Sequence, residues 1–243
     1  MNRMNSRWPV ENVAFPVQSV DLTFLPGPHP LHEAHQAAIE ENWQAEVAQN
    51  PHLFNGRMVL QRSLSITDGR IVGEAHEIPY SALLWWRKQP DPAGAFHLFG
   101  FAVPISSDGA IIAVRMNKHT ANAGQVYCAA GSLDLSDIVD SKIDLFANMR
   151  REVLEETGLD LDAAKADPEF FATHANHRVV VFRFFRFAMT ADEMLKHIEA
   201  HMPHDEEQEI AEALAVRSAD RAAHNYSPLM FPILDLFFGR ERY

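Results

Sequence analysis

Three glutamates near the middle of the chain have the spacing of a carboxylate cluster on one face of a helix. Glu152, Glu155 and Glu156 occupy positions i, i+3 and i+4, which a helix brings within about 100° of arc. Their charges would repel one another, and Gly158 is typical of the left-handed residue that ends a helix, which adds the negative end of the helix dipole. A hard divalent cation would offset both penalties. The alternative is a solvated acidic face, which is common for glutamate-rich helices.

The residues around the glutamates favour a cation site over a solvated face. Arg151 precedes Glu155 by one turn and could hold that carboxylate in one position, which a solvated face would not require. Phe146, Met149 and Val153 form an adjacent apolar stripe that would anchor the helix to a core. The acidic face would then have a rigid support.

This segment resembles the second half of the Nudix box. The matching residues are Arg151, Glu152, Glu155, Glu156, Gly158 and Leu159. In that family the box is a loop, helix and loop whose glutamates bind Mg²⁺ or Mn²⁺, and its members hydrolyse a nucleoside diphosphate linked to another group. The resemblance implies that Glu152, Glu155 and Glu156 are metal ligands. It also implies that Glu155 and Glu156 act in catalysis and that Arg151 orients them.

The first half of the box fits the family pattern less closely. Ala130-Gly131 stands for its glycine pair, and the loop that follows is longer than in the family. Ile143 occupies the acidic position, and Asp144, one step away, could substitute for it. Other candidates are the loop acids Asp134, Asp137 and Asp140. We expect this loop to offer no essential ligand, so that Asp137→Asn should have little effect.

Further site residues are expected outside the box. Family members commonly draw another glutamate from a downstream loop as ligand or base, and the candidates here are Glu206, Glu207 and Glu209. Glu209 is favoured because it directly precedes the apolar run 210–216, although a solvated loop acid is the alternative. The candidate substrate-binding residues are Lys118, His119, Asn122 and His177. For the histidines, a structural role is the alternative. Trp85 and Trp86 could stack on a base or belong to the core.

A resemblance in the N-terminal region bears on the substrate. Residues 38–43 and 50–54 resemble the leader domain of the Nudix branch that cleaves UDP-glucose and UDP-galactose. This resemblance implies a UDP-sugar pyrophosphatase that releases UMP and a sugar 1-phosphate. ADP-ribose and dinucleotides are alternative substrates, and a non-catalytic module that senses a nucleotide is the alternative of another class. Dimerisation is common in this superfamily, so a homodimer is compatible with the resemblance.

Composition limits the other function classes. The chain has 243 residues, 47% of them hydrophobic and 22% charged, which is typical of a globular protein with a substantial core. A net charge of −12 argues against a nucleic-acid partner, and a small-molecule nucleotide would need bridging cations. The single cysteine, Cys128, lies in an apolar run and is expected to be buried. We see no membrane or export segment and expect a cytoplasmic protein.

The remaining pattern predicts an α/β protein in two parts. Residues 1–92 are expected to form a small α+β domain with a strand at 17–24, a helix at 31–49 and a hairpin at 57–78 turning at Asp68-Gly69. Proline and glycine interrupt the chain at 89–94. Residues 93–243 are expected to form the Nudix hydrolase domain, an α/β/α sandwich. Its predicted strands are 96–105, 110–115, 125–130, 170–174, 178–188 and 209–217. Besides the box helix, helices are predicted at 190–202, after a capping box, and at 229–238, interrupted by Pro232.

Overall fold

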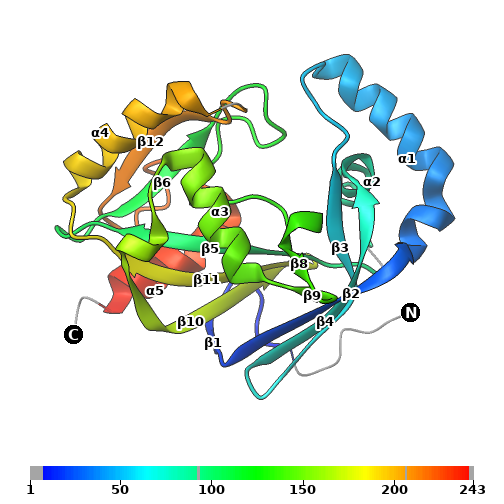
Figure 1. Ribbon diagram of the computed structural model, residues 1–243, viewed down its shortest axis with the longest axis horizontal. Helices are drawn as coiled ribbons and strands as arrows, with labels where there is room; N and C mark the ends of the chain where they lie inside the picture. Colours follow the sequence, from blue (N-terminus) through cyan, green and yellow to red (C-terminus); the bar gives the residue numbers. More distant parts are fainter. Residues whose placement is uncertain (1–7, 92–93, 206, 241–243) are drawn as a thin grey trace.

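The computed structural model describes residues 8–91, 94–205 and 207–240. It shows a mixed α/β protein whose strands form a larger and a smaller sheet (Figure 1). The larger sheet has the strand order β1 (Phe15–Val17), β10 (Lys165–Ala175), β11 (Arg178–Arg186), β5 (His97–Ile105), β6 (Ile111–Met116) and β12 (Ile210–Val216), and β7 (Val126–Tyr127) also pairs with β6. Strands β11 and β5 are parallel, and their neighbours in this sheet are antiparallel.

Helices cover both faces of the larger sheet, which makes the α/β/α sandwich predicted from the sequence. Helix α3 (Leu145–Thr157) packs on β5 at Gly100, where an added Cβ would lie 2.6 Å from Met149 Cε. Only glycine lets the helix approach this closely. Helix α5 (Phe231–Arg240) packs on the opposite face, where the Phe237 and Phe184 rings are 5.4 Å apart. Val181, the register partner of Gly100, and Phe184 are an odd number of residues apart, so they point to opposite faces.

The smaller sheet has the order β3 (Arg57–Thr67), β4 (Arg70–Pro79), β2 (Ser19–Pro28), β9 (Lys142–Ile143) and β8 (Ile138–Val139). The predicted hairpin is confirmed as β3 and β4, with positive φ at Asp68 and Gly69 in its turn. Helix α1 (Pro30–Gln49) agrees with the helix predicted at 31–49. Helix α2 (Tyr80–Trp86), which the pattern did not predict, buries Trp86 in a local core with Ile39, Met58, Leu60, Ile78 and Leu83. Trp86 is therefore a core residue.

The two parts of the chain are joined by strand pairing. Strand β1 pairs with β10 of the larger sheet, and Lys142 in β9 pairs with Thr23 in β2. The long loop after Gly131 therefore supplies two edge strands, β8 and β9, to the smaller sheet. The boundary predicted between residues 92 and 93 lies outside the described residues. Strands from each side of this boundary pair with strands from the other side. The division into two domains stays a prediction.

Helix ends follow local chemistry. Helix α4 (Ala191–His201) begins at the predicted capping box, where Thr190 Oγ1 accepts from Glu193 N at 3.4 Å and Glu193 Oε2 accepts from Thr190 N at 2.8 Å. Pro232 lies in the first turn of α5, where no intrahelical bond needs its missing N–H. The predicted interruption of the helix at Pro232 is therefore wrong. Short 3₁₀ helices span Leu135–Asp137, Leu161–Ala163, Met202–His204 and Pro228–Met230.

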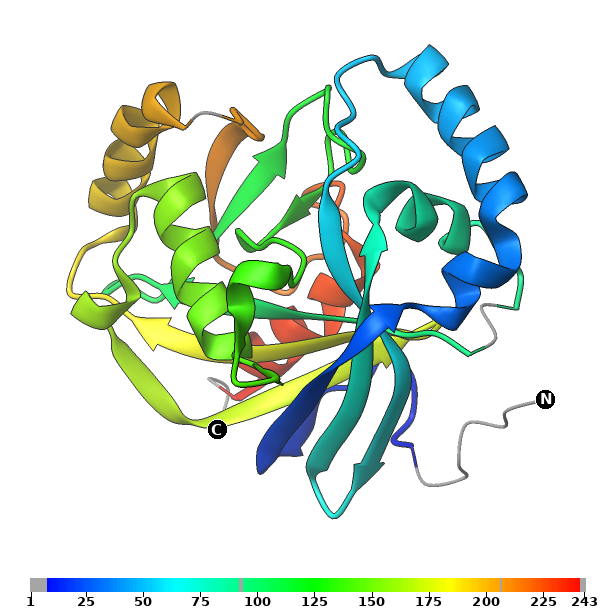
Figure 2. The same cartoon turned by 45° about the vertical axis from the view of Figure 1, so that its right-hand side comes forward.

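The views in Figures 1 and 2 agree that α1 and α2 lie on one side of α3 and that α4 and β12 lie on the other. Cys128 is buried, as predicted, and burial raises the pKa of its thiol. Within the described ranges, none of the helices combines the length and the apolar character needed to cross a membrane.

Candidate active site

The glutamate helix is capped at both ends, at its C-terminus by the glycine predicted there and at its N-terminus by an aspartate that was predicted only as a possible acid of the box. Asp144 is the N-cap of α3, and its Oδ1 accepts from Phe146 N at 3.1 Å and from Ala147 N at 2.9 Å. This carboxylate is therefore used to cap the helix. Gly158 ends the helix with φ 70°, as predicted. Two histidines of α4 bind the last carbonyls, with His201 Nε2 2.8 Å from Glu155 O and His197 Nε2 2.8 Å from Gly158 O.

Glu156 is the most buried acid of the cluster. Its side chain points inward from α3, the residue is 6% exposed, and its Oε2 has no hydrogen-bond partner among the described residues. Burial raises the pKa of this carboxyl well above its usual value, and the charges of Glu152, Glu209 and Asp205 raise it further. A buried acid without a full set of partners destabilises the fold, so its presence favours a functional explanation.

Glu152 packs directly on the glycine that opens the box. A Cβ added at Gly131 would lie 2.1 Å from Glu152 Oε2, so any other residue there would displace the Glu152 carboxylate. Burial raises the pKa of Glu152 to about 7, although the Arg151 guanidinium opposes the shift. The predicted alignment of Ala130-Gly131 with the helix glutamates is therefore consistent with the geometry.

Arg151 binds four carboxylates rather than the single one that its spacing predicted. Its guanidinium lies 3.2 Å from Glu155 Oε2, which confirms the predicted contact, and 2.8 Å from Glu152 Oε1. It also lies 3.3 Å from Asp137 Oδ1 and 3.4 Å from Asp134 Oδ2. Arg151 thus holds the helix glutamates and the preceding loop together.

Asp137 is buried, which is a structural reason, separate from metal binding, to expect that its replacement has an effect. The residue is 3% exposed, and its Oδ2 accepts from Asp134 N at 2.9 Å and from Asn148 Nδ2 at 3.0 Å. Arg151 also donates to both carboxylate oxygens. An asparagine NH₂ group in place of either oxygen would therefore face a donor instead of an acceptor. The loop acid is therefore part of the structural support of the site.

Asp137→Asn is now expected to destabilise the fold by about 1–3 kcal/mol, because the asparagine amide would face donors at either oxygen position. Urea unfolding followed by circular dichroism measures this effect. Asp140→Asn is the matched control, since Asp140 is exposed in the same loop and its φ of 49° suits asparagine. Equal midpoints for the two variants would contradict the role given to Asp137.

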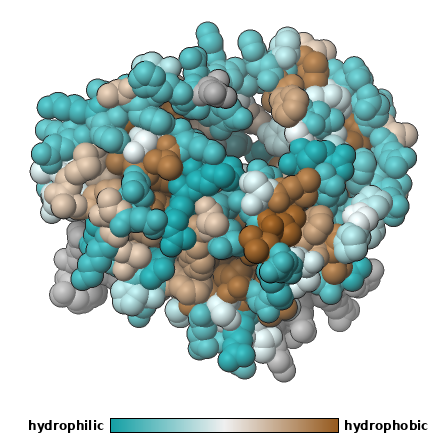
Figure 3. Space-filling view, viewed as in Figure 1, coloured by the Kyte–Doolittle hydropathy of each residue, from teal (hydrophilic) through white to brown (hydrophobic). Residues whose placement is uncertain are grey.

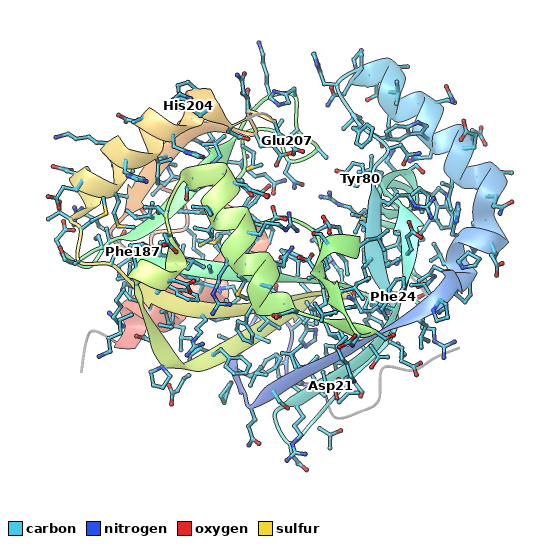
Figure 4. The ribbon with its side chains drawn as sticks, viewed as in Figure 1. Asp21, Phe24, Tyr80, Phe187, His204 and Glu207 are labelled. Atoms are coloured by element: carbon cyan, nitrogen blue, oxygen red, sulfur yellow. The ribbon has the colours of Figure 1, made fainter. Side chains whose placement is uncertain are left out.

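The structure separates the helix glutamates into two groups. Glu156 lies within the fields of Glu152 and Glu209, and the pKa of Glu209 is itself raised by burial and then by Glu207 and Asp205. Glu155 is exposed and turns to Arg151. Glu209 directly precedes β12, as expected, and its carbonyl accepts from Asn117 N at 2.7 Å. Glu207 lies across the opening from Tyr80 of α2 in Figure 4. Glu206 lies outside the described residues.

The donor chemistry of this cluster suits a hard divalent cation. Within residues 8–91, 94–205 and 207–240, no three His, Cys, Asp or Glu side chains are arranged closely enough to hold a metal ion. The groups that face the site are nonetheless carboxylates, and one oxygen of Glu156 is buried without a partner. Carboxylate oxygens are the ligands that Mg²⁺ and Mn²⁺ prefer. The donor chemistry of these residues, though not their present spacing, therefore fits such an ion.

The predicted substrate-binding residues lie in different surroundings. Asn122 lines a pocket that also borders Gly131, whereas Lys118 is exposed. His119 Nε2 is 3.2 Å from Glu207 O, on the loop before β12. His177 lines a neighbouring cavity, where its ring stacks on Phe96 at 4.9 Å. Figure 3 shows the surface hollowed between the side that carries α4 and the side that carries α1.

Pattern reasoning did not find the other residues of this pocket. They include Arg87, His97, Phe99, Phe101, Tyr127 and Arg178. Burial lowers the pKa of His97 to about 3, and the charges of Arg87 and Arg178 lower it further. The arginines stand alone in the sequence with no motif around them, so only the tertiary structure brings them together. The polar and aromatic lining is typical of a small-molecule site.

No protein-family model and no curated protein sequence match this chain. Among solved structures, the chain is similar to the MutT protein from Methanosarcina mazei Go1, with 18% identity, a TM-score of 0.40, and 60% of this chain and 95% of that one covered. DR0079 from Deinococcus radiodurans is similar with 13% identity, a TM-score of 0.46, and coverage of 75% and 99%. The E. coli ORF135 protein is similar with 14% identity, a TM-score of 0.35, and coverage of 60% and 92%. Similarity at this level leaves the function to be argued from the site.

Proposed function

We propose that the protein is a Nudix-type hydrolase that cleaves the pyrophosphate bond of a UDP-sugar and releases UMP and a sugar 1-phosphate. The observation that carries this proposal is the buried carboxyl of Glu156, which has an unpartnered oxygen beside Glu152 and Glu209. Its helix has the residue pattern of the Nudix box, and the glycine before the box contacts Glu152. A stable fold alone does not require this concentration of acids.

In this proposal Glu152, Glu155 and Glu156 hold Mg²⁺ or Mn²⁺. When bound, such a cation neutralises phosphate oxygens and so makes the phosphorus accessible to water. Arg151 keeps Glu152 and Glu155 in position through its ion pairs at 2.8 and 3.2 Å. Glu209 is a further ligand or the general base, since burial brings its pKa closer to neutrality.

The nucleotide would occupy the pocket that adjoins Gly131. The N-terminal part resembling the leader domain of UDP-sugar hydrolases supplies Arg87 to this pocket. Tyr80 of the same part is half-buried; burial raises its pKa, and Glu209 is among the charges that raise it further. The N-terminal part therefore lies close enough to the acids to contact a substrate, which supports a role for it in substrate choice.

Incubation with Mg²⁺ and a nucleotide panel tests the proposal. We expect UMP and a sugar 1-phosphate from UDP-glucose or UDP-galactose, detected by ³¹P NMR or chromatography. In competition at equal concentration, the UDP-sugar is expected to be consumed before ADP-ribose, and the reverse order would reject the substrate assignment. Binding without turnover of UDP-sugars, ADP-ribose or dinucleotides would favour the non-catalytic nucleotide sensor.

A further inference from the structure

Two arginines of the pocket have no acidic partner. Arg87 follows α2 in the N-terminal part and Arg178 begins β11 in the larger sheet, and both line the pocket beside Gly131 and the neighbouring cavity. Within the described part of the chain, neither forms an ion pair with a carboxylate, although several arginines elsewhere do. Those paired arginines are Arg57, Arg62, Arg115, Arg150, Arg151, Arg186, Arg217 and Arg221. Glu11 and Asp91 also line the neighbouring cavity, yet neither forms an ion pair with the two arginines. In a chain with net charge −12, two neighbouring arginines that form no ion pair need an explanation.

The two guanidinium groups are close enough to repel each other. Burial lowers the pKa of Arg178, and the charge of Arg87 lowers it further. His97, which is 9% exposed, lies within the field of both arginines. Among the described residues, no carboxylate offsets that field at His97. Like charges that share a partly buried site destabilise the free protein. An anion bound between them would remove this cost.

The position of Arg87 is set by a short hydrogen-bond chain. Arg87 Nη2 donates to Asn122 Oδ1 at 2.8 Å, and Asn122 Nδ2 donates to Tyr127 Oη at 3.1 Å. Tyr127 in turn lies within the fields of Arg87, Glu156 and Glu209. It therefore lies near both Arg87 and the acids. The Tyr127 ring stacks on Phe101 at 5.9 Å, and both rings line the pocket, which gives it an aromatic wall.

We propose that Arg87 and Arg178 together bind a phosphate group of the nucleotide without the help of a metal. The planar guanidinium presents N–H donors in a fork that matches phosphate oxygens, and two forks from different elements can hold one group from two sides. Arg87 comes from the N-terminal part and Arg178 from the larger sheet, so the ligand would bridge both parts. The inference rests on the proposed function for the nature of the ligand, while the anion site itself is independent of turnover.

Calorimetric binding in EDTA tests this site apart from any metal. The probes are inorganic pyrophosphate, UDP-glucose, UMP and uridine. We expect the native protein to bind the phosphate-bearing probes, and Arg87→Gln and Arg178→Gln each to weaken that binding by about tenfold or more, as loss of a charged hydrogen bond does. If the variants lose as much affinity for UMP as for pyrophosphate, the arginines hold a phosphate monoester. If only pyrophosphate and UDP-glucose lose affinity, they hold the diphosphate. Uridine binding should not change.

The matched control is Arg70→Gln, which removes an exposed arginine at the start of β4. It should bind pyrophosphate as the native protein does. Because the two pocket variants relieve repulsion, their unfolding temperature should not fall, so weaker binding cannot be ascribed to misfolding. Unchanged pyrophosphate affinity in both pocket variants, or no metal-free binding by the native protein, would overturn the anion site. If binding depends on the two arginines but no nucleotide is hydrolysed, the anion site is supported and the proposed hydrolase activity is rejected.

Discussion

Glu156→Gln is expected to lower the hydrolysis of UDP-glucose by about 100-fold or more while the fold is retained, because the change keeps the shape of the side chain and removes its charge. In the proposed function this carboxylate is a metal ligand, and an amide is a poorer ligand for a hard cation. The measurement is the initial rate at saturating Mg²⁺, with the secondary structure checked by circular dichroism.

Glu199→Gln is the matched control for this result. Glu199 is an exposed glutamate of α4, so the same chemical change there should leave the rate unaltered. A rate for Glu156→Gln within a few-fold of the control would reject the assignment of the α3 acids as the reaction site.

The same variant is also expected to be more stable than the native protein at alkaline pH in EDTA. Burial raises the pKa of Glu156 in the folded state above its unfolded value, so the folded state binds the proton more tightly. The free energy of unfolding of the native protein therefore falls as pH rises from the unfolded pKa through the folded one. Glutamine does not titrate, so the advantage of the variant should appear above this range and vanish at about pH 4. A variant that loses stability with pH as the native protein does would contradict the burial of Glu156.

Arg151→Met is expected to destabilise the fold by about 3 kcal/mol, because it leaves the buried carboxylate of Asp137 without its cation. The Arg151 side chain is 29% exposed and that of Asp137 2%, so the loss should lie at the lower end of the range for broken buried pairs, about 3–5 kcal/mol. Hydrolysis should fall as well, since Glu152 and Glu155 lose the group that positions them. Urea unfolding and initial rates measure the two effects.

The neighbouring arginine gives a close comparison. Arg150 pairs with Asp162 at 2.9 Å, and the two side chains are 51% and 73% exposed. Solvent screens such a pair, so Arg150→Met should cost less than about 1 kcal/mol. If the two methionine variants unfolded at the same urea concentration, the support role of Arg151 would have to be abandoned.

Local signals predicted the elements around the site well. The capping box at Thr190 and Glu193, the left-handed Gly158 and the hairpin turn at Asp68-Gly69 all form as expected. Each depends on residues within one or two turns of each other, and the interactions within so short a segment depend little on the rest of the chain. The helix α2 was missed because it is short and nearly all of it is buried, so it has no amphipathic period to read.

Long-range pairing was outside the reach of pattern reasoning. The loop after Gly131 was expected to offer no essential ligand, and its structural role was not predicted: β8 and β9 extend the smaller sheet, and Asp137 is buried against Arg151. The pairing of Lys142 with Thr23 joins segments that are far apart in the chain. Nothing in either segment alone encodes its partner, because strand pairing is decided by the packing of the whole sheet.

By itself, the sequence determined that Glu152, Glu155 and Glu156 share one helix face, since helical periodicity sets that relation regardless of the surroundings. Only the tertiary structure decided that Glu156 is buried beside Glu209 while Glu155 stays in solvent, because burial depends on what packs against the helix. It also decided that Arg87 and Arg178 line one pocket. A single sequence carries no local signal for that encounter, since it arises where the end of a short helix meets the start of a distant strand.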